Sequence, residues 1–237
     1  MSRSVFSFLS SARRSVLVVL GATLLALVLV VVASAALAPK KADAATAQVV
    51  TKTFNKPAAI LIPAGAGLGD CDSNFNWAAE PYPSIRSVQA FPSGSTILDV
   101  NLVLRGFSHT HPDDVDVLLT KGIPKGSRAR TVMSDVGSNK GVNDITLTLD
   151  DEADEPLPEE GPLVSGRFKP TNLAGGLGTI TLDLFPPPVG NINANPSLNF
   201  EGLSPNGQWK LRVADDESAD CGEFAGGWSL IIKARVP

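Results

Sequence analysis

Residues 206–216 read NGQWKLRVADD, and residues 226–232 read GGWSLII. In the first stretch apolar and polar residues alternate from Trp209 to Val213, and the second repeats this alternation from Trp228. A period of two residues is typical of β-strands that bury one face. The two stretches therefore predict a strand pair near the C-terminus, joined by a turn rich in acidic residues.

Short alternating stretches recur through most of the chain. The expected strands cover residues 58–63, 84–91, 97–107, 115–120, 129–133 and 144–149, and residues 161–205 are expected to form a long, partly irregular crossover. With 21 glycines and 18 prolines, the composition suits short strands joined by turns. No helical period follows the N-terminal region. We therefore expect an all-β fold, an antiparallel, jelly-roll-like β-sandwich of roughly eight or nine strands.

The N-terminal region differs from the rest of the sequence. Three arginines precede an uncharged run over residues 16–38, which is rich in valine, leucine and alanine. Such a run is typical of an export signal, and at roughly 20 residues it is also long enough to span a bilayer. We therefore expect a hydrophobic export helix within residues 1–44, acting as a signal peptide or as a membrane anchor. Residues 45–57 are expected to be a linker, and residues 58–237 the folded, extracytoplasmic domain.

The charge balance excludes one class of partner. Without the three leader arginines, 17 of the 20 basic residues remain against 24 acidic residues, which gives a net charge of −7. An acidic protein is poorly suited to bind nucleic acid or an anionic membrane. We expect neither partner, and membrane contact only through the N-terminal segment.

The two cysteines, Cys71 and Cys221, both lie in the exported part. Export permits a disulfide, and a bond closing so long a loop would stabilise the fold by about 4–5 kcal/mol in the chain-entropy model. Two free thiols or half of a metal site are the alternatives. No histidine or second cysteine lies close to either residue in the sequence, so we favour the disulfide.

Several ordered blocks of the sequence resemble a known family. They are His109-Thr110, DVDVLL at residues 114–119, NGQWKLRV at residues 206–213, Asp215, Gly222, and GGWSL at residues 226–230. From Pro57 to Val236 the chain resembles the P domain, or Homo B domain, of proprotein convertases such as kexin and furin. It looks most like the bacterial exported form, here without a preceding subtilisin-like catalytic domain.

The resemblance implies a jelly-roll β-sandwich without catalytic residues of its own. In that family the domain supports the folding, stability and calcium dependence of a subtilisin-like protease. Asp113 stands where the family usually has glycine, and Val115 where it has leucine. The family's signature residues, with an implied structural role, are His109, Asp114, Gly207, Trp209, Asp215, Gly222 and Trp228. The resemblance thus predicts a non-catalytic stability or protein-binding module, whose partner is a separate secreted protease or another exported protein.

The alternative is an enzyme. His109, His111 and Asp113 follow the spacing that begins a zinc motif of metallo-β-lactamase type, and such a hydrolase would use these three residues. A serine-type endopeptidase-associated role is the other enzymatic alternative. The chain has no Gly-x-Ser-x-Gly elbow, and its only histidines are these two. We therefore expect no enzymatic activity.

Calcium is the one cofactor that the sequence suggests. Calcium prefers oxygen ligands gathered from several loops. The candidate ligands fall into two groups, Asp113, Asp114 and Asp116 in one, and Asp215, Asp216 and Asp220 in the other. Neither group has EF-hand spacing, and a solvated acidic loop is the alternative for each.

Overall fold

The computed structural model describes residues 47–63, 71, 77–122, 129–173, 183–192, 196–217 and 219–237. These residues belong to one compact unit, Ala44–Pro237. The expected signal peptide or anchor falls outside the described residues. Among the residues described, no helix is long and apolar enough to cross a membrane.

The larger of two main sheets has seven strands. Its main path runs β1 (Gln48–Lys56), β14 (Trp228–Val236), β4 (Thr96–His109), β13 (Gly222–Phe224) and β2 (Ile60–Ile62). Off this path, β7 (Val142–Leu149) pairs with β4, and β8 (Gly166–Phe168) pairs with β7. All pairs are antiparallel except β7 with β8.

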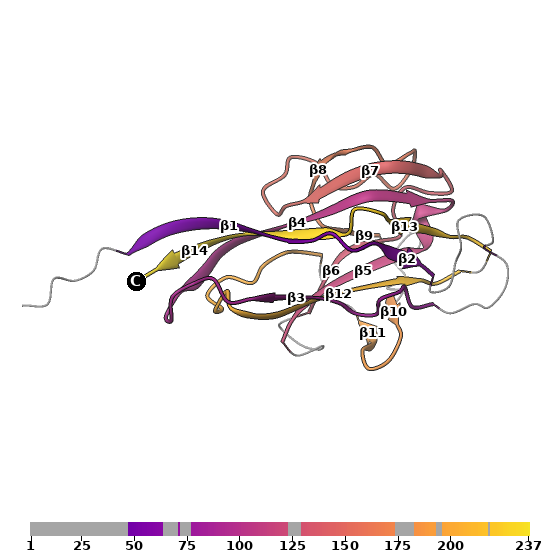
Figure 1. Ribbon diagram of the computed structural model, residues 1–237. Coiled ribbons are helices and arrows are strands. Elements are labelled where there is room, and N and C mark those ends of the chain that lie inside the picture. The colour runs from indigo at the N-terminus through magenta and orange to yellow at the C-terminus, as the bar shows by residue number, and fades with distance from the viewer. Residues whose placement is uncertain are drawn as a thin grey trace, which may run out of the picture. The chain divides into compact units, whose positions relative to one another are not determined.

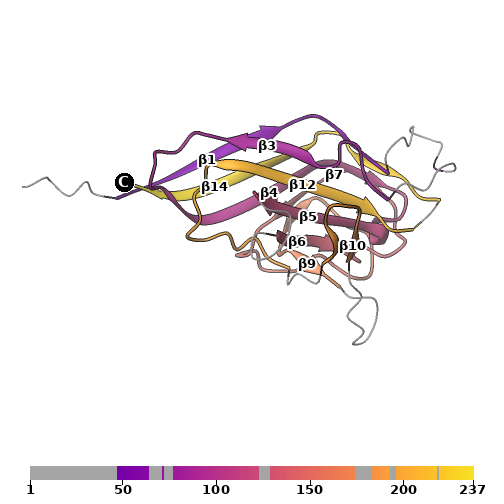
Figure 2. The same ribbon diagram turned by 90° about the horizontal axis from the view of Figure 1, so that it is seen from below.

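The second sheet has five strands. They are, in order, β3 (Ser84–Val88), β12 (Gly207–Asp215), β5 (Val115–Lys121), β6 (Ala129–Ser134) and β9 (Thr171–Asn172). A short 3-10 helix, η1 (Pro112–Asp114), links β4 to β5. The two sheets lie face to face, as Figure 1 shows from the side and Figure 2 from below. The described residues thus confirm the expected all-β sandwich.

The structure divides the two tryptophan-led strands between the sheets. β12 pairs with β3 and β5, whereas β14 pairs with β1 and β4, so the expected strand pair near the C-terminus is wrong. Trp209 and Trp228 are both fully buried in the core between the sheets. Their indole N–H groups donate to Pro205 O at 3.1 Å and to Ser84 Oγ at 2.9 Å. The alternation identified the buried faces, but the same pattern fits a strand of either sheet.

The expected linker is also wrong over most of its length. Residues 48–56 form β1, which pairs in unbroken register with β14 from Gln48↔Val236 to Lys56↔Trp228. Phe54 is buried and its ring packs against Phe91, with 5.9 Å between ring centroids. β1 is an edge strand that buries few side chains, so its sequence lacks the alternation by which the other strands were found.

The described residues contain fourteen strands, more than expected. Most of the additional ones have two or three residues and lie in the region expected to be an irregular crossover. Among them, β10 (Asp183–Phe185) and β11 (Gly190–Ile192) form a hairpin. Figures 1 and 2 place this hairpin over the outer face of the five-stranded sheet. Phe185 and Val189 pack there against Leu118, Ala129 and Ala214, in a second and smaller hydrophobic cluster.

Candidate functional site

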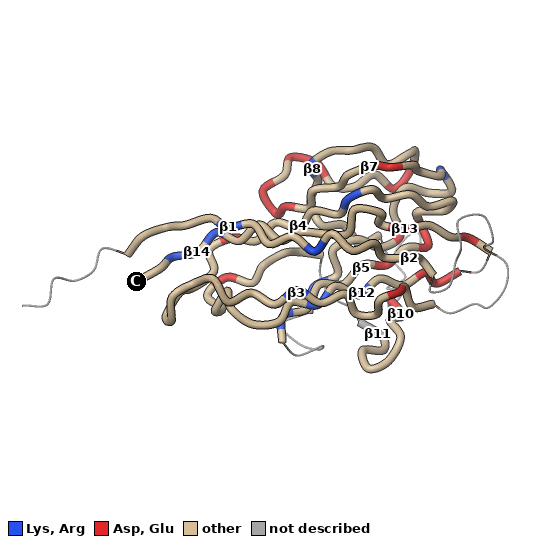
Figure 3. The backbone as a smooth tube through the Cα atoms, in the orientation of Figure 1, with Lys and Arg blue, Asp and Glu red and all other residues tan. Residues whose placement is uncertain are grey.

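Several strand ends meet at one end of the sandwich. β4 ends at His109, which is opposite Gly222 at the start of β13, and β12 ends at Asp215, which is opposite the first residue of β5. The N–H of Thr110 donates to Cys221 O at 3.1 Å and ties the loop after β4 to the residue before β13. Figure 3 shows acidic residues gathered near β13 and β2, away from the C-terminus. We call His109, His111, Asp114, Asp215 and Asp220 the His–Asp end.

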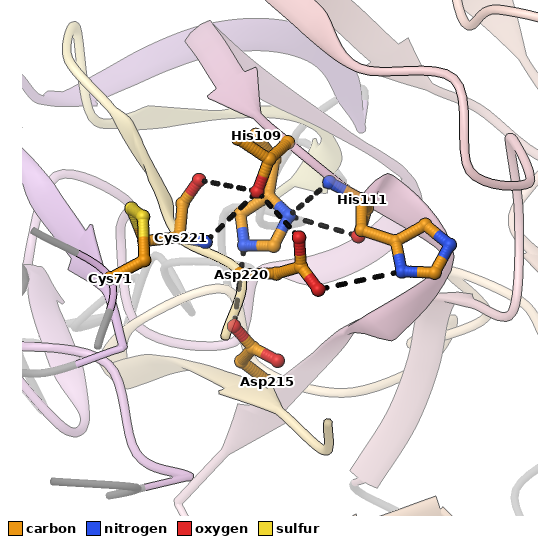
Figure 4. The surroundings of a disulfide bond; sticks show 7 residues. Cys71, His109, His111, Asp215, Asp220 and Cys221 are labelled. Atoms are coloured by element: carbon orange, nitrogen blue, oxygen red, sulfur yellow. Dashed lines mark hydrogen bonds and ion pairs between the residues drawn. A yellow bond between two sulfur atoms is a disulfide. The ribbon is translucent and has the colours of Figure 1, made fainter. Parts of the chain in front are cut away.

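His109 is enclosed at the centre of this end. Its side chain and that of Asp215 are both 0% exposed, and His109 Nε2 lies 3.3 Å from Asp215 Oδ2. His109 Nδ1 lies 2.9 Å from His111 O and 3.2 Å from His111 N. If Nδ1 is protonated it can donate to the carbonyl oxygen, and if it is not it can accept from the N–H, so the backbone of His111 offers a partner for both tautomers. Figure 4 shows the ring between Asp215 and the backbone of His111. Nδ1 is therefore hydrogen-bonded, whereas Nε2 lies near the Asp215 carboxylate without a hydrogen bond of good geometry to the described residues.

A glycine lets β13 approach β4 at this point. A Cβ on Gly222 would overlap the carbonyl oxygen of Ser108 and lie 2.7 Å from His109 Cα. These are backbone atoms, which cannot move aside without separating the two strands. The structural role of Gly222 is therefore to permit close contact between the backbones of β13 and β4.

His111 lies just outside this buried pair. Its Nδ1 is 2.8 Å from Asp114 Oδ2 and 3.6 Å from Asp220 Oδ2. The hydroxyl of Thr110 donates to the other oxygen of Asp220 at 2.9 Å. Figure 4 shows the Asp220 carboxylate facing the ring of His111. One imidazole and two carboxylates thus converge, from the residue before η1, from η1 itself, and from the segment between β12 and β13.

The structure contains the expected disulfide. Cys71 and Cys221 are bonded, with 5.3 Å between their Cα atoms, and neither is free. The Cys221 N–H also donates to Thr110 Oγ1 at 3.1 Å. The disulfide therefore fixes the residue that follows Asp220, next to the converging side chains.

Burial and nearby negative charges raise the pKa of two aspartates in this region, Asp114 and Asp216. Burial, with the charges of Asp215 and Asp220, raises the pKa of Asp114 to about 6, although nearby His111 acts in the opposite direction. Burial raises the pKa of Asp216 to about 7, and Asp135 and Asp114 add to the increase. The local charge balance is therefore acidic, with more carboxylates than cationic partners.

The structure separates the first predicted group of calcium ligands. Asp114 joins the His–Asp end, whereas Asp116 lies on the outer face of the five-stranded sheet. There, burial and the charge of Asp183 raise the pKa of Asp116 well above its usual range, and its Oδ2 accepts no hydrogen bond from the described residues. Asp113 belongs to neither cluster.

The second predicted group separates as well. Asp215 faces His109, and Asp220 faces His111 and Thr110. Asp216 has Asp135 as its strongest charged neighbour. The side chains of Asp114 and Asp220, one from each predicted group, therefore lie close to each other and to His111. The side chains of the other four candidates are not part of this three-residue cluster.

Sequence reasoning missed Asp183. It is buried and accepts hydrogen bonds from Thr131 Oγ1 at 3.0 Å, from Asn172 Nδ2 at 2.8 Å and from Ser134 Oγ at 3.2 Å. In the sequence, Asp183 stands within the short apolar stretch at residues 180–185. An aspartate at that position also fits the polar side of an alternating strand, so it did not indicate a buried carboxylate.

The three residues of the hydrolase alternative do not form one site. His109 faces Asp215, His111 faces Asp114, and Asp113 contributes to neither pair. In the described part of the chain, the only group of three or more histidine, cysteine or acidic side chains close enough to share an ion is His111, Asp114 and Asp220. The cluster therefore contains Asp114 and not its neighbour Asp113.

Comparisons with family models, with curated proteins and with solved structures found no match for this chain. The resemblance to the P domain stays a prediction.

Proposed function

We propose that the exported part of this chain is a non-catalytic β-sandwich module that binds and stabilises another exported protein. The main support is the state of the two histidines. A histidine that acts as general base must reach a nucleophile with one ring nitrogen while a carboxylate orients the other. The backbone of His111 holds Nδ1 of His109, and Nε2 lies 3.3 Å from Asp215 Oδ2 without a hydrogen bond of good geometry to any described residue. Because the side chain is fully buried, neither nitrogen can reach a substrate.

His111 comes closer to a catalytic arrangement. Its Nδ1 faces Asp114 at 2.8 Å, and its side chain is 33% exposed. Within the described segments, however, no serine, threonine or cysteine side chain hydrogen-bonds to either histidine ring. The pair has an orienting carboxylate without a nucleophile, which favours a binding or structural role.

Two further observations support export and partner binding. A disulfide that joins Cys71 to Cys221 suits a protein outside the cytoplasm. The resemblance to the P domain supplies the class of partner, a secreted protease or another exported protein.

The binding proposal is tested with the purified chain as bait in the exported protein fraction of its own cells. We expect one exported protein to be retained in stoichiometric amount, and its melting temperature to rise when the purified chain is added. A retained protein whose melting temperature does not change would contradict the stabilising role. Retention of no exported protein would contradict binding itself.

A further inference from the structure

We propose that His111, Asp114 and Asp220 form a binding site for a first-row divalent metal ion of the zinc type. One ring nitrogen and two carboxylate oxygens of these residues all lie within 4.8 Å of one another. The sequence pointed to calcium and to groups of neighbouring aspartates. The proposed site goes beyond the proposed function, since it would bind metal whether or not a protein partner exists.

The spacing of the three ligand atoms suits a small ion. His111 Nδ1 lies 2.8 Å from Asp114 Oδ2 and 3.6 Å from Asp220 Oδ2. Tetrahedral Zn²⁺, with nitrogen and oxygen ligands at about 2.0–2.2 Å, places its ligand atoms about 3.3 Å apart. These two separations would change by about half an ångström or less to reach that spacing, and the two carboxylate oxygens lie within 4.8 Å of each other.

The donor set favours such an ion over calcium. Calcium takes six to eight oxygen ligands, whereas imidazole nitrogen is a preferred ligand of zinc and related metals. Two carboxylates and one imidazole leave a fourth position for water or a side chain of a partner. His111 and Asp220 are 33% and 26% exposed, so an ion could enter from solvent.

A buried oxygen without a hydrogen bond is independent support. Asp114 Oδ2 is buried and accepts no hydrogen bond of good geometry from the described residues, and its side chain is 7% exposed. Its closest charged neighbour is the His111 ring nitrogen at 2.8 Å. Buried carboxylate oxygens normally have partners, and a cation at the centre of the cluster would supply one.

The second ligand-bearing loop is held in place. Thr110 donates to Asp220 Oδ1 at 2.9 Å and leaves Oδ2 directed at His111. The Cys221 N–H donates to the same threonine hydroxyl at 3.1 Å, and the disulfide holds Cys221. Hydrogen bonds that orient carboxylate ligands are characteristic of metal sites. Figure 4 shows the Asp220 carboxylate facing the His111 ring, with the Cys71–Cys221 disulfide on the side away from His111.

The test is titration of the untagged, chelator-treated full chain with ZnCl₂ and, separately, with CaCl₂, followed by calorimetry. We expect one Zn²⁺ per chain, bound more tightly than Ca²⁺. Asp220→Asn keeps the side-chain shape and should weaken zinc binding by at least about ten-fold, and His111→Ala should do the same. Asp113→Asn removes the same charge from a neighbouring position outside the cluster and should leave the affinity within about two-fold.

Thermal melting of each variant without metal checks that the fold is intact. Should His111→Ala fail to fold, the pair Asp220→Asn and Asp113→Asn decides the question. Equal zinc affinity in those two variants would overturn the proposal, as would Ca²⁺ binding at least as tightly as Zn²⁺. The absence of zinc binding by the wild-type chain would reduce the cluster to an ion pair between His111 and its two aspartates, and would also overturn it.

Discussion

At the residue scale, Gly222 shows how one position controls the approach of two strands. A Cβ at this position would overlap backbone atoms of Ser108 and His109, which cannot move without displacing the strand. We predict that Gly222→Ala lowers the free energy of unfolding by about 3 kcal/mol or more, the upper part of the range for overpacked sites. Urea denaturation measures the loss.

Gly202→Ala is the matched control for this substitution. Gly202 has a φ of +74° with no atom within 4 Å of an added Cβ, so only the strained backbone conformation opposes the new side chain. The expected loss is about 1 kcal/mol. Equal losses at both glycines would show that β13 does not approach β4 as closely as described.

Tyr82 gives a prediction about pH, because it is the only tyrosine in the chain. Burial raises its pKa to about 12, although nearby Arg212 acts in the opposite direction. The folded state therefore holds the phenolic proton more tightly than the unfolded state. The resulting stabilisation is complete below the unfolded pKa of about 10, and is lost as the pH rises from about 10 towards 12.

The near-ultraviolet absorbance of tyrosinate measures this ionisation directly. We expect a midpoint near 12 in the folded chain and near 10 in guanidinium, with circular dichroism on the same samples to monitor the fold. A folded-state midpoint near 10 would contradict the partly buried position of Tyr82 and its hydrogen bond to Pro186 O.

At the scale of elements, β1 is the feature that the sequence did not indicate. We predict that Phe54→Ala destabilises the fold by about 3 kcal/mol, because the ring is buried against the core. Val49→Ala, in the same strand but 54% exposed, should change the stability by less than about 0.5 kcal/mol. Similar small effects of both substitutions would mean that residues 48–56 act as a linker.

The other strands show why the sequence pattern predicts some strands and not others. Expected residues 115–120 and 144–149 correspond closely to β5 and β7, where side chains directed at the core recur at every second position. In β7 the alternation follows from burial of one face. β5 is buried on both faces, and its period is visible because polar Asp116 and Thr120 alternate with Val115, Val117 and Leu119. β1 buries chiefly one large side chain, and β9 has two residues, so neither produces a detectable period.

At the scale of the whole molecule, the disulfide joins residues 150 positions apart. Replacing both cysteines by alanine should lower the free energy of unfolding by about 4–5 kcal/mol, because the unfolded chain regains the entropy of that loop. Urea denaturation of the variant and of the oxidised wild type measures the difference. A difference below about 1 kcal/mol would show that the loop-closure entropy is offset in the native state.

The His–Asp end also depends on the whole fold. The sequence identified His109, His111 and the aspartates as candidates, because these residue types can bind ions or carry out catalysis. It did not indicate that Asp114 and Asp220 meet while Asp116 lies on another face, because that depends on how β4, β5, β12 and β13 end. Local spacing suggested groups of sequence neighbours, and the strand arrangement brings together residues that are distant in sequence.

Hydrolysis of quenched-fluorescent peptides tests the central claim, a non-catalytic module, most directly. The purified chain and its His111→Ala variant are compared, each with chelator and with added Zn²⁺. We predict no turnover above buffer for either protein under either condition. Turnover by the wild-type chain that is lost in His111→Ala would contradict the account and would establish an enzyme at the His–Asp end.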